Sequence, residues 1–281
     1  MARANGARGA LAALARLVAI AAALGQTPDA AMARARVPTD ARVRIDGGRY
    51  RPLYRQPVRG ANRDTLLRKV VAVEVRPFEL HRDLVTNAEY LEFVRGHPEW
   101  RRSRVSRLFA DESYLHHWRG DLDPGPGGSL RSPVVYVSWF AARAYCAAGG
   151  ARLPTWDEWE FAAAADATRA DARSDPQWRQ RMLDWYASHG EQDMRVGQRA
   201  PDLYGVHDLP DGVWEWVDDF NALLVSGDDR EQGDPDRMKF CGAGALSLRD
   251  REAYAVLMRV AMLSSLEARF TTRDLGFRCA K

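Results

Sequence analysis

Residues 133–164, PVVYVSWFAARAYCAAGGARLPTWDEWEFAAA, constrain the fold of this chain more than any other stretch. The β-branched run at residues 134–137 predicts a short strand, and Ser138 is a residue type that caps the start of a helix. Ala-rich helix formers follow as far as Gly149 and Gly150, which favour a helix end. We therefore expect a strand that leads directly into a helix.

A second helix is predicted immediately afterwards. Thr155 is followed three residues later by Glu158, which is the spacing of a capping box. Trp159, Phe161 and Ala162 continue the helical pattern. Two capped helices are thus expected within one short stretch.

The first 36 residues predict a secretory signal peptide. Arg3 and Arg8 precede an apolar run at residues 17–24, and triplets of small residues lie within or after it. The run is too short to span a membrane. Arg16 interrupts the apolar segment, so a disordered Ala/Arg-rich leader is the alternative. We expect a leader at 1–36, one domain at 37–281, and a periplasmic or secreted protein with no stable membrane insertion after signal removal.

The charge balance and the cysteines limit the classes of partner. Lys and Arg total 41 and Asp and Glu total 38, so no basic footprint for nucleic acid is visible. The three cysteines, Cys146, Cys241 and Cys279, form no C-x-x-C pair and are too separated for a zinc motif. One disulfide plus one free thiol and three unpaired cysteines both remain open, and the sequence does not choose a pair.

Alternating apolar and polar residues in 42–80 predict paired strands with a turn at Gly47 and Gly48. One face of the sheet would carry Val71, Val73, Val75, Phe78 and Leu80. Thr86 or Asn87 then caps a helix that carries Tyr90 and Leu91.

Residues 98–131 predict a long surface loop with a short helix. His116 and His117 suggest a metal site, but adjacent side chains on a regular element point apart, so both could reach one ion only from an irregular backbone. Asp121 and Asp123 offer oxygen ligands for calcium as an alternative.

The central stretch resembles the sulfatase-modifying-factor family, which includes the formylglycine-generating enzymes. That family's wording is close to PV-x-VSW-x-x-A-x-AYC-x-x-x-G-x-RLPT-x-x-EWE-x-A, and further matches run from Gly47 to the closing L-G-F-R-C-A at residues 275–280. The resemblance covers nearly all of residues 37–281. It implies an α+β, loop-rich single domain with the formylglycine-generating-enzyme fold, a relative of the C-type lectin fold.

The resemblance also implies a structural calcium site. Residues 204–220, YGVHDLPDGVWEWVDDF, are similar to the family's calcium loop. Position by position, Asp208 and Glu215 would bind through side chains, and Asp211 and Val213 through carbonyls. The usual Gly-Asn is Asp211-Gly212 here, which puts the turn geometry in question. The alternative is an acidic turn tied to arginine side chains.

The chemistry of the active enzymes is missing from this sequence. In the formylglycine-generating enzymes, two cysteines between the Gly-Gly-Ser turn and the closing block bind copper(I). Here no cysteine lies between Gly242 and Arg278, and Cys241 precedes the turn. The resemblance to the iron-dependent sulfoxide synthases fails too, because their H-x-x-x-H-x-E pattern is absent. Formylglycine synthesis is therefore not predicted.

The finer resemblance is to exported NirV-type proteins, companions of copper nitrite reductases. It implies an accessory or maturation role, in which a groove lined by Trp214, Arg259 and Arg278 meets a partner protein or peptide. The alternative is an oxygen- or metal-dependent oxidase with a rebuilt copper or iron site. The catalytic candidates are Cys241, Trp214 and Arg259. The soft ligands for copper would be Cys241, Met238, Met258 and Met262, although the spacing of the last two suits core packing on a helix at least as well.

Overall fold

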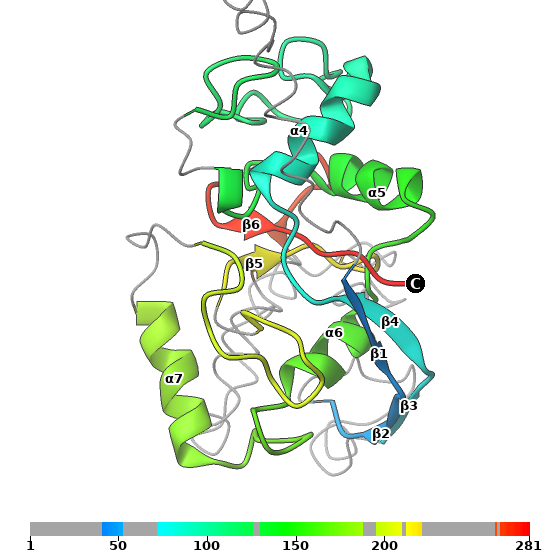
Figure 1. Cartoon of the computed structure of the whole chain (residues 1–281), viewed down its shortest axis with the longest axis vertical. Coiled ribbons are helices and arrows are strands. Elements are labelled where there is room, and N and C mark those ends of the chain that lie inside the picture. The colour runs from blue at the N-terminus through cyan, green and yellow to red at the C-terminus, as the bar shows by residue number, and fades with distance from the viewer. Residues whose placement is uncertain are drawn as a thin grey trace, which may run out of the picture. The chain divides into compact units, whose positions relative to one another are not determined.

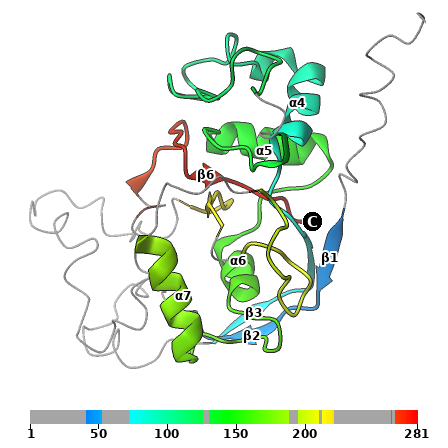
Figure 2. The same ribbon diagram turned by 60° about the vertical axis from the view of Figure 1, so that its left-hand side comes forward.

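The computed structural model describes residues 41–52, 72–125, 130–187, 195–209, 212–220, 262 and 265–281. All of them lie in the compact unit Asp40–Lys281. In two views, the short strands β5 and β6 lie side by side, with α4 and α5 on one side of them and α6 on the other (Figures 1 and 2).

An antiparallel ribbon opens the described chain. β1 (Arg42–Ile45) pairs with β4 (Phe78–His81), and β2 (Gly48–Tyr50) pairs with β3 (Val73–Val75). The register is unchanged across the gap, because Ile45 faces Phe78 and Gly48 faces Val75. The prediction of paired strands is confirmed.

The predicted turn at Gly47 and Gly48 is wrong, because the chain passes through both glycines without reversing. Gly47 has a φ of +70°, and a Cβ there would lie 2.2 Å from the carbonyl oxygen of Val75. Glycine at position 47 therefore allows the two paired backbone segments to approach closely where the ribbon is interrupted. Val75, Phe78 and Leu80 are buried, as the sequence predicts, whereas Val71 lies outside the described residues.

The C-terminal residues extend this sheet. The His81 N–H donates to the Cys279 carbonyl at 2.9 Å, and the Ala280 N–H donates to the Arg152 carbonyl at 2.7 Å. Residues 279–281 thus lie between β4 and Arg152. Just before them, β6 (Leu275–Gly276) pairs in parallel with β5 (Trp214–Glu215).

The predicted helix caps are confirmed. Thr86 caps α4 (Asn87–Gly96) and forms a capping box with Glu89. Ser138 caps α5 (Trp139–Ala148), and Thr155 caps α6 (Trp156–Ala163) in a capping box with Glu158. Local sequence therefore sets where these three helices begin. A fourth helix, α7, spans Pro176–Ala187.

The strand expected at residues 134–137 does not form. The Val134 N–H donates to Val85, and the Tyr136 N–H donates to Thr272. The Tyr136 carbonyl accepts from Leu115, and Tyr136 itself has a positive φ of 56°. Because each backbone group binds a different segment, no ladder is built, despite the β-branched residues.

The prediction of a surface loop after α4 is wrong about burial, because part of this stretch lies in the core. After the short 3-10 helix η1 (Pro98–Trp100), the described part of this stretch is irregular, yet it contributes to the core. Tyr114, Leu115 and Trp118 are each at most 2% exposed. The Trp118 indole N–H donates to the Asn87 side-chain oxygen at 2.8 Å, so this stretch is anchored to the start of α4.

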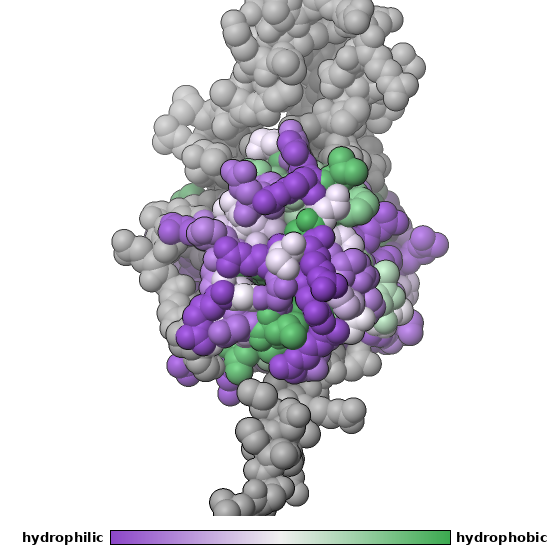
Figure 3. Space-filling view, turned by 90° about the horizontal axis from the view of Figure 1, so that it is seen from above, coloured by the Kyte–Doolittle hydropathy of each residue, from purple (hydrophilic) through white to green (hydrophobic). Residues whose placement is uncertain are grey.

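One hydrophobic cluster joins these elements. It includes Tyr90 of α4, Trp159 of α6, Trp216 and Phe277. Trp159 is 3% exposed and Trp139 is partly buried against the cluster, as the predicted fold requires. The face seen from above in Figure 3 is mainly hydrophilic in its described part, with small separate hydrophobic patches. Each helix that the structure describes is too short or too polar to span a lipid bilayer.

Candidate functional site

A buried ion pair stands where the sequence predicts a calcium ligand. The parallel pairing of β5 with β6 places Glu215 beside Gly276, two residues before Arg278. The Arg278 Nε donates to one Glu215 oxygen at 2.8 Å, and Nη2 donates to the other at 3.1 Å. Arg278 is 0% exposed and Glu215 is 1% exposed. This is a two-point guanidinium–carboxylate pair inside the core.

Arg278 also binds the backbone carbonyls of two other segments. Its Nη1 donates to His81 at 3.3 Å and to Arg82 at 3.1 Å, at the end of β4. Its Nη2 donates to the His207 carbonyl at 3.1 Å. The guanidinium therefore holds the end of β4, the segment before Asp208 and the C-terminal residues together.

Asp208 occupies a constrained turn. It is 5% exposed and has a φ of +59°, and its Oδ2 accepts from the Gly197 N–H at 2.7 Å. A Cβ on Gly212 would lie 2.6 Å from the Asp208 carbonyl oxygen. The glycine at 212 is thus required by the close approach of the two backbones, which explains its position in the Asp211-Gly212 order.

The donor chemistry of this region suits a hard cation only in part. Asp208 and Glu215 are buried carboxylates, but both Glu215 oxygens already accept from Arg278. No group of three or more His, Cys, Asp or Glu side chains in the described ranges could hold a metal. Calcium would therefore depend on carbonyls, of which Asp211 lies outside the described residues and Val213 lies within them. The calcium site stays a prediction.

The predicted groove is not formed by Trp214 and Arg278. Trp214 is 5% exposed, and its ring lies 5.4 Å from that of Trp185 on α7. Arg278 is fully buried, so neither side chain lines an open surface. The other candidates, Cys241 and Arg259, lie outside the described residues.

His117 packs against interior residues, whereas its neighbour His116 is exposed. The His117 Nε2 lies 3.1 Å from the Asn87 side-chain oxygen, and its ring stacks on Tyr136. Burial, together with the charge of Arg102, lowers the pKa of His117 to about 4. Because His117 is committed to Asn87, and His116 is exposed, the geometry favours a structural role.

Asp121 and Asp123 both accept hydrogen bonds from groups within the chain. Asp121 accepts from the Ser103 N–H at 2.8 Å and from its hydroxyl at 2.6 Å. Asp123 accepts from Arg119 at 3.1 Å and from the Gly125 N–H at 2.9 Å. The alternative of calcium at this loop gains no support from these contacts.

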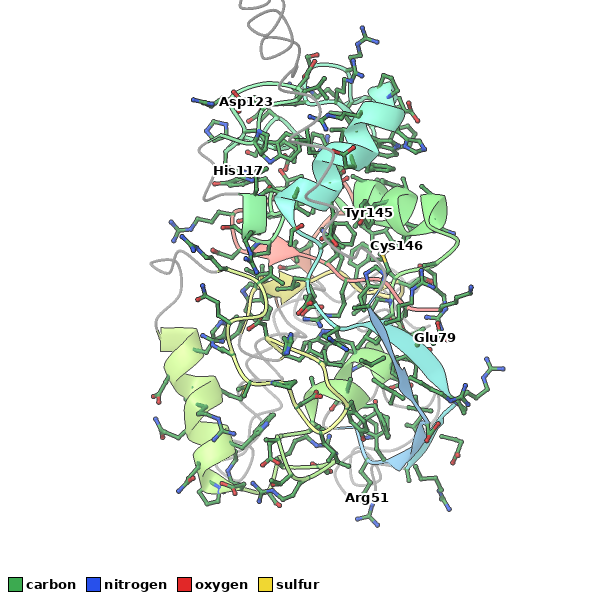
Figure 4. All side chains as sticks on the ribbon, in the orientation of Figure 1. Arg51, Glu79, His117, Asp123, Tyr145 and Cys146 are labelled. Atoms are coloured by element: carbon green, nitrogen blue, oxygen red, sulfur yellow. A yellow bond between two sulfur atoms is a disulfide. The ribbon has the colours of Figure 1, made fainter. Side chains whose placement is uncertain are left out.

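The cysteines are resolved into a pair. Cys146 of α5 and Cys279 form a disulfide with a Cα–Cα distance of 5.6 Å, and both are 1% exposed. Figure 4 labels Cys146 next to Tyr145, on the helix beside the C-terminal segment. The disulfide is consistent with an oxidising compartment. Since the chain has three cysteines, only Cys241 is left as a thiol.

Two features of the site lay beyond the sequence reasoning. His207 Nδ1 lies 2.6 Å from an Asp83 oxygen, a contact between positions 124 residues apart that carries no local signal. Trp185 covers Trp214, and here a signal existed, because Trp178, Met182 and Trp185 follow the spacing of one helix face.

The sequence matches a known protein family over most of its length. A model of the family described as Sulfatase-modifying factor enzyme 1-like domain matches residues 27–281. The chain belongs to this family. The sulfatase-modifying-factor fold predicted from the sequence is thus confirmed, as α+β and loop-rich.

Three relatives show the range of names within the family. The chain is 29% identical to an inactive C-alpha-formylglycine-generating enzyme 2 of Bos taurus, over 85% of this chain and 87% of that protein. It is 30% identical to a formylglycine-generating enzyme of Streptomyces coelicolor, over 75% and 80% of the two chains. It is 32% identical to a hercynine oxygenase of Mycobacterium tuberculosis, over 52% of this chain but only 38% of that protein.

Proposed function

We propose that this protein is an exported, non-catalytic accessory or maturation factor, and that its partner is a copper nitrite reductase. The observation that carries the proposal is the cysteine pairing. A copper(I) site of the type implied by the family resemblance needs two thiolates. With Cys146 and Cys279 in a disulfide, Cys241 is the one cysteine left, and one thiol does not make that site.

Several further observations support the proposal. The bovine relative that aligns over most of both chains is named an inactive enzyme. Trp214 and Arg278 are buried in contacts within the chain, so contact with the partner would use a surface other than the groove expected from the sequence. The basic and apolar leader at residues 1–36 and the disulfide both favour export. The choice of a nitrite reductase rests on the resemblance to NirV-type proteins alone.

The candidate methionine ligands give little support to a role in handling copper. Met262 is partly buried and packs against the main hydrophobic cluster, which favours core packing at this position. Met238 and Met258 lie outside the described residues. The proposed role is therefore contact with the partner rather than transfer of a bound metal.

The proposal is tested by producing a copper nitrite reductase in an export-competent host with and without this chain. We expect the chain to raise the copper content and the nitrite-reducing activity of the purified reductase. The Cys241→Ser variant should work equally well, because no step uses its thiol. No change in either quantity when the chain is present would refute the accessory role.

Elemental analysis of the purified chain separates this role from the alternative of a metal-dependent oxidase. The 30% identity to a protein named a formylglycine-generating enzyme is the reason to test that alternative. Calcium alone, equal in the protein and in Cys241→Ser, would support a structural ion and a binding role. Stoichiometric copper or iron that is lost in Cys241→Ser would overturn the proposal in favour of an oxidase.

A further inference from the structure

Large apolar side chains are exposed on the loop that follows η1 and on the segment that precedes β6. Leu108 is 78% exposed, Phe109 is 45% exposed and Phe270 is 41% exposed. The ring of Phe109 also lies 5.4 Å from that of Phe140, in the first turn of α5. We call these four residues the apolar patch. Apolar side chains that gather on a surface with polar residues at the rim mark interaction sites.

Hydrogen bonds hold the two segments of the apolar patch together. The Asp111 N–H donates to the Arg269 carbonyl at 2.9 Å, and the Thr271 N–H donates to the Asp111 carboxylate at 2.9 Å. Ala110, next to Asp111 in the loop, is fully buried. Phe270 is therefore fixed beside the loop. Because the backbone beneath the patch is already ordered, association would not have to order it.

A hollow of about 480 Å³, open to solvent, lies beside the exposed leucine. Its wall consists of one aromatic ring and five charged side chains, which are Phe270, Arg107, Asp111, Glu112, Glu267 and Arg269. Leu108 directly follows Arg107 but is not part of this wall, so a projecting apolar side chain stands next to a recess. Across a two-fold axis, the projection of each copy of such a surface can enter the recess of the other.

The charges around the hollow are of both signs. The carboxylate of Asp111 already accepts hydrogen bonds within the chain, and Arg269 pairs with Glu267 at 2.8 Å. Arg107 and Glu112 are exposed, and neither takes part in an ion pair with any residue that the structure describes. One cation and one anion on the same surface are self-complementary, because a two-fold axis can bring each opposite the other twice. A surface of one sign would repel a second copy.

We propose that the apolar patch is the interface of a symmetric homodimer. Leu108 of each copy enters the hollow of the other, against Phe270, and Arg107 of each copy pairs with Glu112 of the other. The contact is isologous, so it closes at two copies and does not extend into a fibre. The homodimer does not depend on the accessory role, because its partner is the chain itself.

Analytical ultracentrifugation of the purified chain tests the dimer. Between about 1 and 200 µM we expect a monomer–dimer equilibrium with a Kd on the order of 10 µM. Leu108→Ser should weaken association about a hundredfold, because two leucines lose their burial in each dimer. Leu203→Ser is the matched control, since Leu203 is 50% exposed but does not line the hollow, and it should leave the Kd unchanged. A chain that stays monomeric at the highest concentration, or a dimer that Leu108→Ser leaves intact, would overturn the proposal.

Charge reversal tests whether Arg107 and Glu112 meet across the interface. Arg107→Glu and Glu112→Arg should each weaken self-association about tenfold, because each places like charges opposite one another twice. A one-to-one mixture of the two variants should form a heterodimer with the parent Kd, since both of its contacts then join opposite charges. An effect confined to one chain would not be restored by mixing, so a mixture that stays monomeric would overturn the assigned pairing. Both experiments use the chain alone, so their failure is distinct from failure of the nitrite reductase experiment.

Discussion

Replacing Arg278 by lysine tests whether the buried ion pair holds the domain together. Lysine keeps the charge, but its ammonium has three donors and cannot present the planar, two-point geometry that Glu215 meets. Arg278 makes five hydrogen bonds, two to Glu215 and three to backbone carbonyls, so at least two are lost. Hydrogen bonds to charged groups contribute about 1.5–3 kcal/mol each, so we expect a loss of roughly 3 kcal/mol or more.

Glu215→Gln removes the carboxylate that pairs with the fully buried guanidinium of Arg278. Breaking a buried pair by removing one partner costs about 3–5 kcal/mol. For a domain of this size, 1 kcal/mol lowers Tm by about 2–4 °C, so 3 kcal/mol corresponds to a fall of about 6–12 °C.

Urea unfolding followed by circular dichroism measures these changes, with the m-value as a check that the unfolded state is unaltered. Arg269→Lys is the matched control, because Arg269 pairs with Glu267 at the exposed surface. That substitution should leave the transition where it was. If Arg278→Lys and Glu215→Gln each shifted the free energy of unfolding by less than about 1 kcal/mol, the pair would not support the fold as described.

Three further predictions follow from the same structure. Cys146→Ser or Cys279→Ser should lower the free energy of unfolding by about 2–5 kcal/mol, since the disulfide closes a loop with a sequence separation of 133; a reducing agent should destabilise the parent protein but not the variants. Gly47→Ala should cost at least 1–3 kcal/mol in a urea titration, because of its positive φ and the nearby Val75 carbonyl, whereas Gly96→Ala, with open space around it, should be neutral or slightly stabilising. Folding lowers the pKa of His117 from 6.5 to about 4, so the contribution of its neutral form to stability is complete above pH 6.5 and is lost as the pH falls towards 4. In His117→Gln, the free energy of unfolding should therefore differ less between pH 7.5 and pH 4.5 than it does in the parent protein. An unchanged difference would contradict the assignment.

The parts of the fold that the sequence predicts are those set by neighbours along the chain. Thr86, Ser138 and Thr155 cap their helices because a side chain reaches a backbone N–H three residues away. Such contacts form in any context that allows the helix, so a local pattern is enough to place them.

The errors arose where distant segments decide the geometry. Gly47 is a residue type typical of turns, but β1 and β2 on either side of it pair with β4 and β3 in one register, so the chain does not reverse there. Tyr136 lies in a β-branched run, yet its backbone is divided between Leu115 and Thr272, and no neighbouring strand exists there to complete a ladder among the described residues.

The candidate site shows the same division. The sequence leaves open whether the acidic stretch around Asp208 holds calcium or is tied to arginine side chains, and in the structure Glu215 meets Arg278 across 63 residues of chain. No local pattern distinguishes a carboxylate held by arginine from one that awaits calcium. The cysteine pairing was open for the same reason, because the choice between Cys241 and Cys279 as a partner of Cys146 depends on the path of the C-terminal residues along β4.

With Cys146 and Cys279 in a disulfide, one thiol is left, and we propose that the chain does not build the two-cysteine copper(I) site. The decisive experiment incubates the chain with copper(I), oxygen and a sulfatase-derived peptide that contains the target cysteine, and follows that cysteine by mass spectrometry. An active formylglycine-generating enzyme is the positive control. We expect an unchanged peptide from this chain and from its Cys241→Ser variant alike. Conversion of the peptide cysteine to formylglycine by the parent chain, lost in Cys241→Ser, would contradict it.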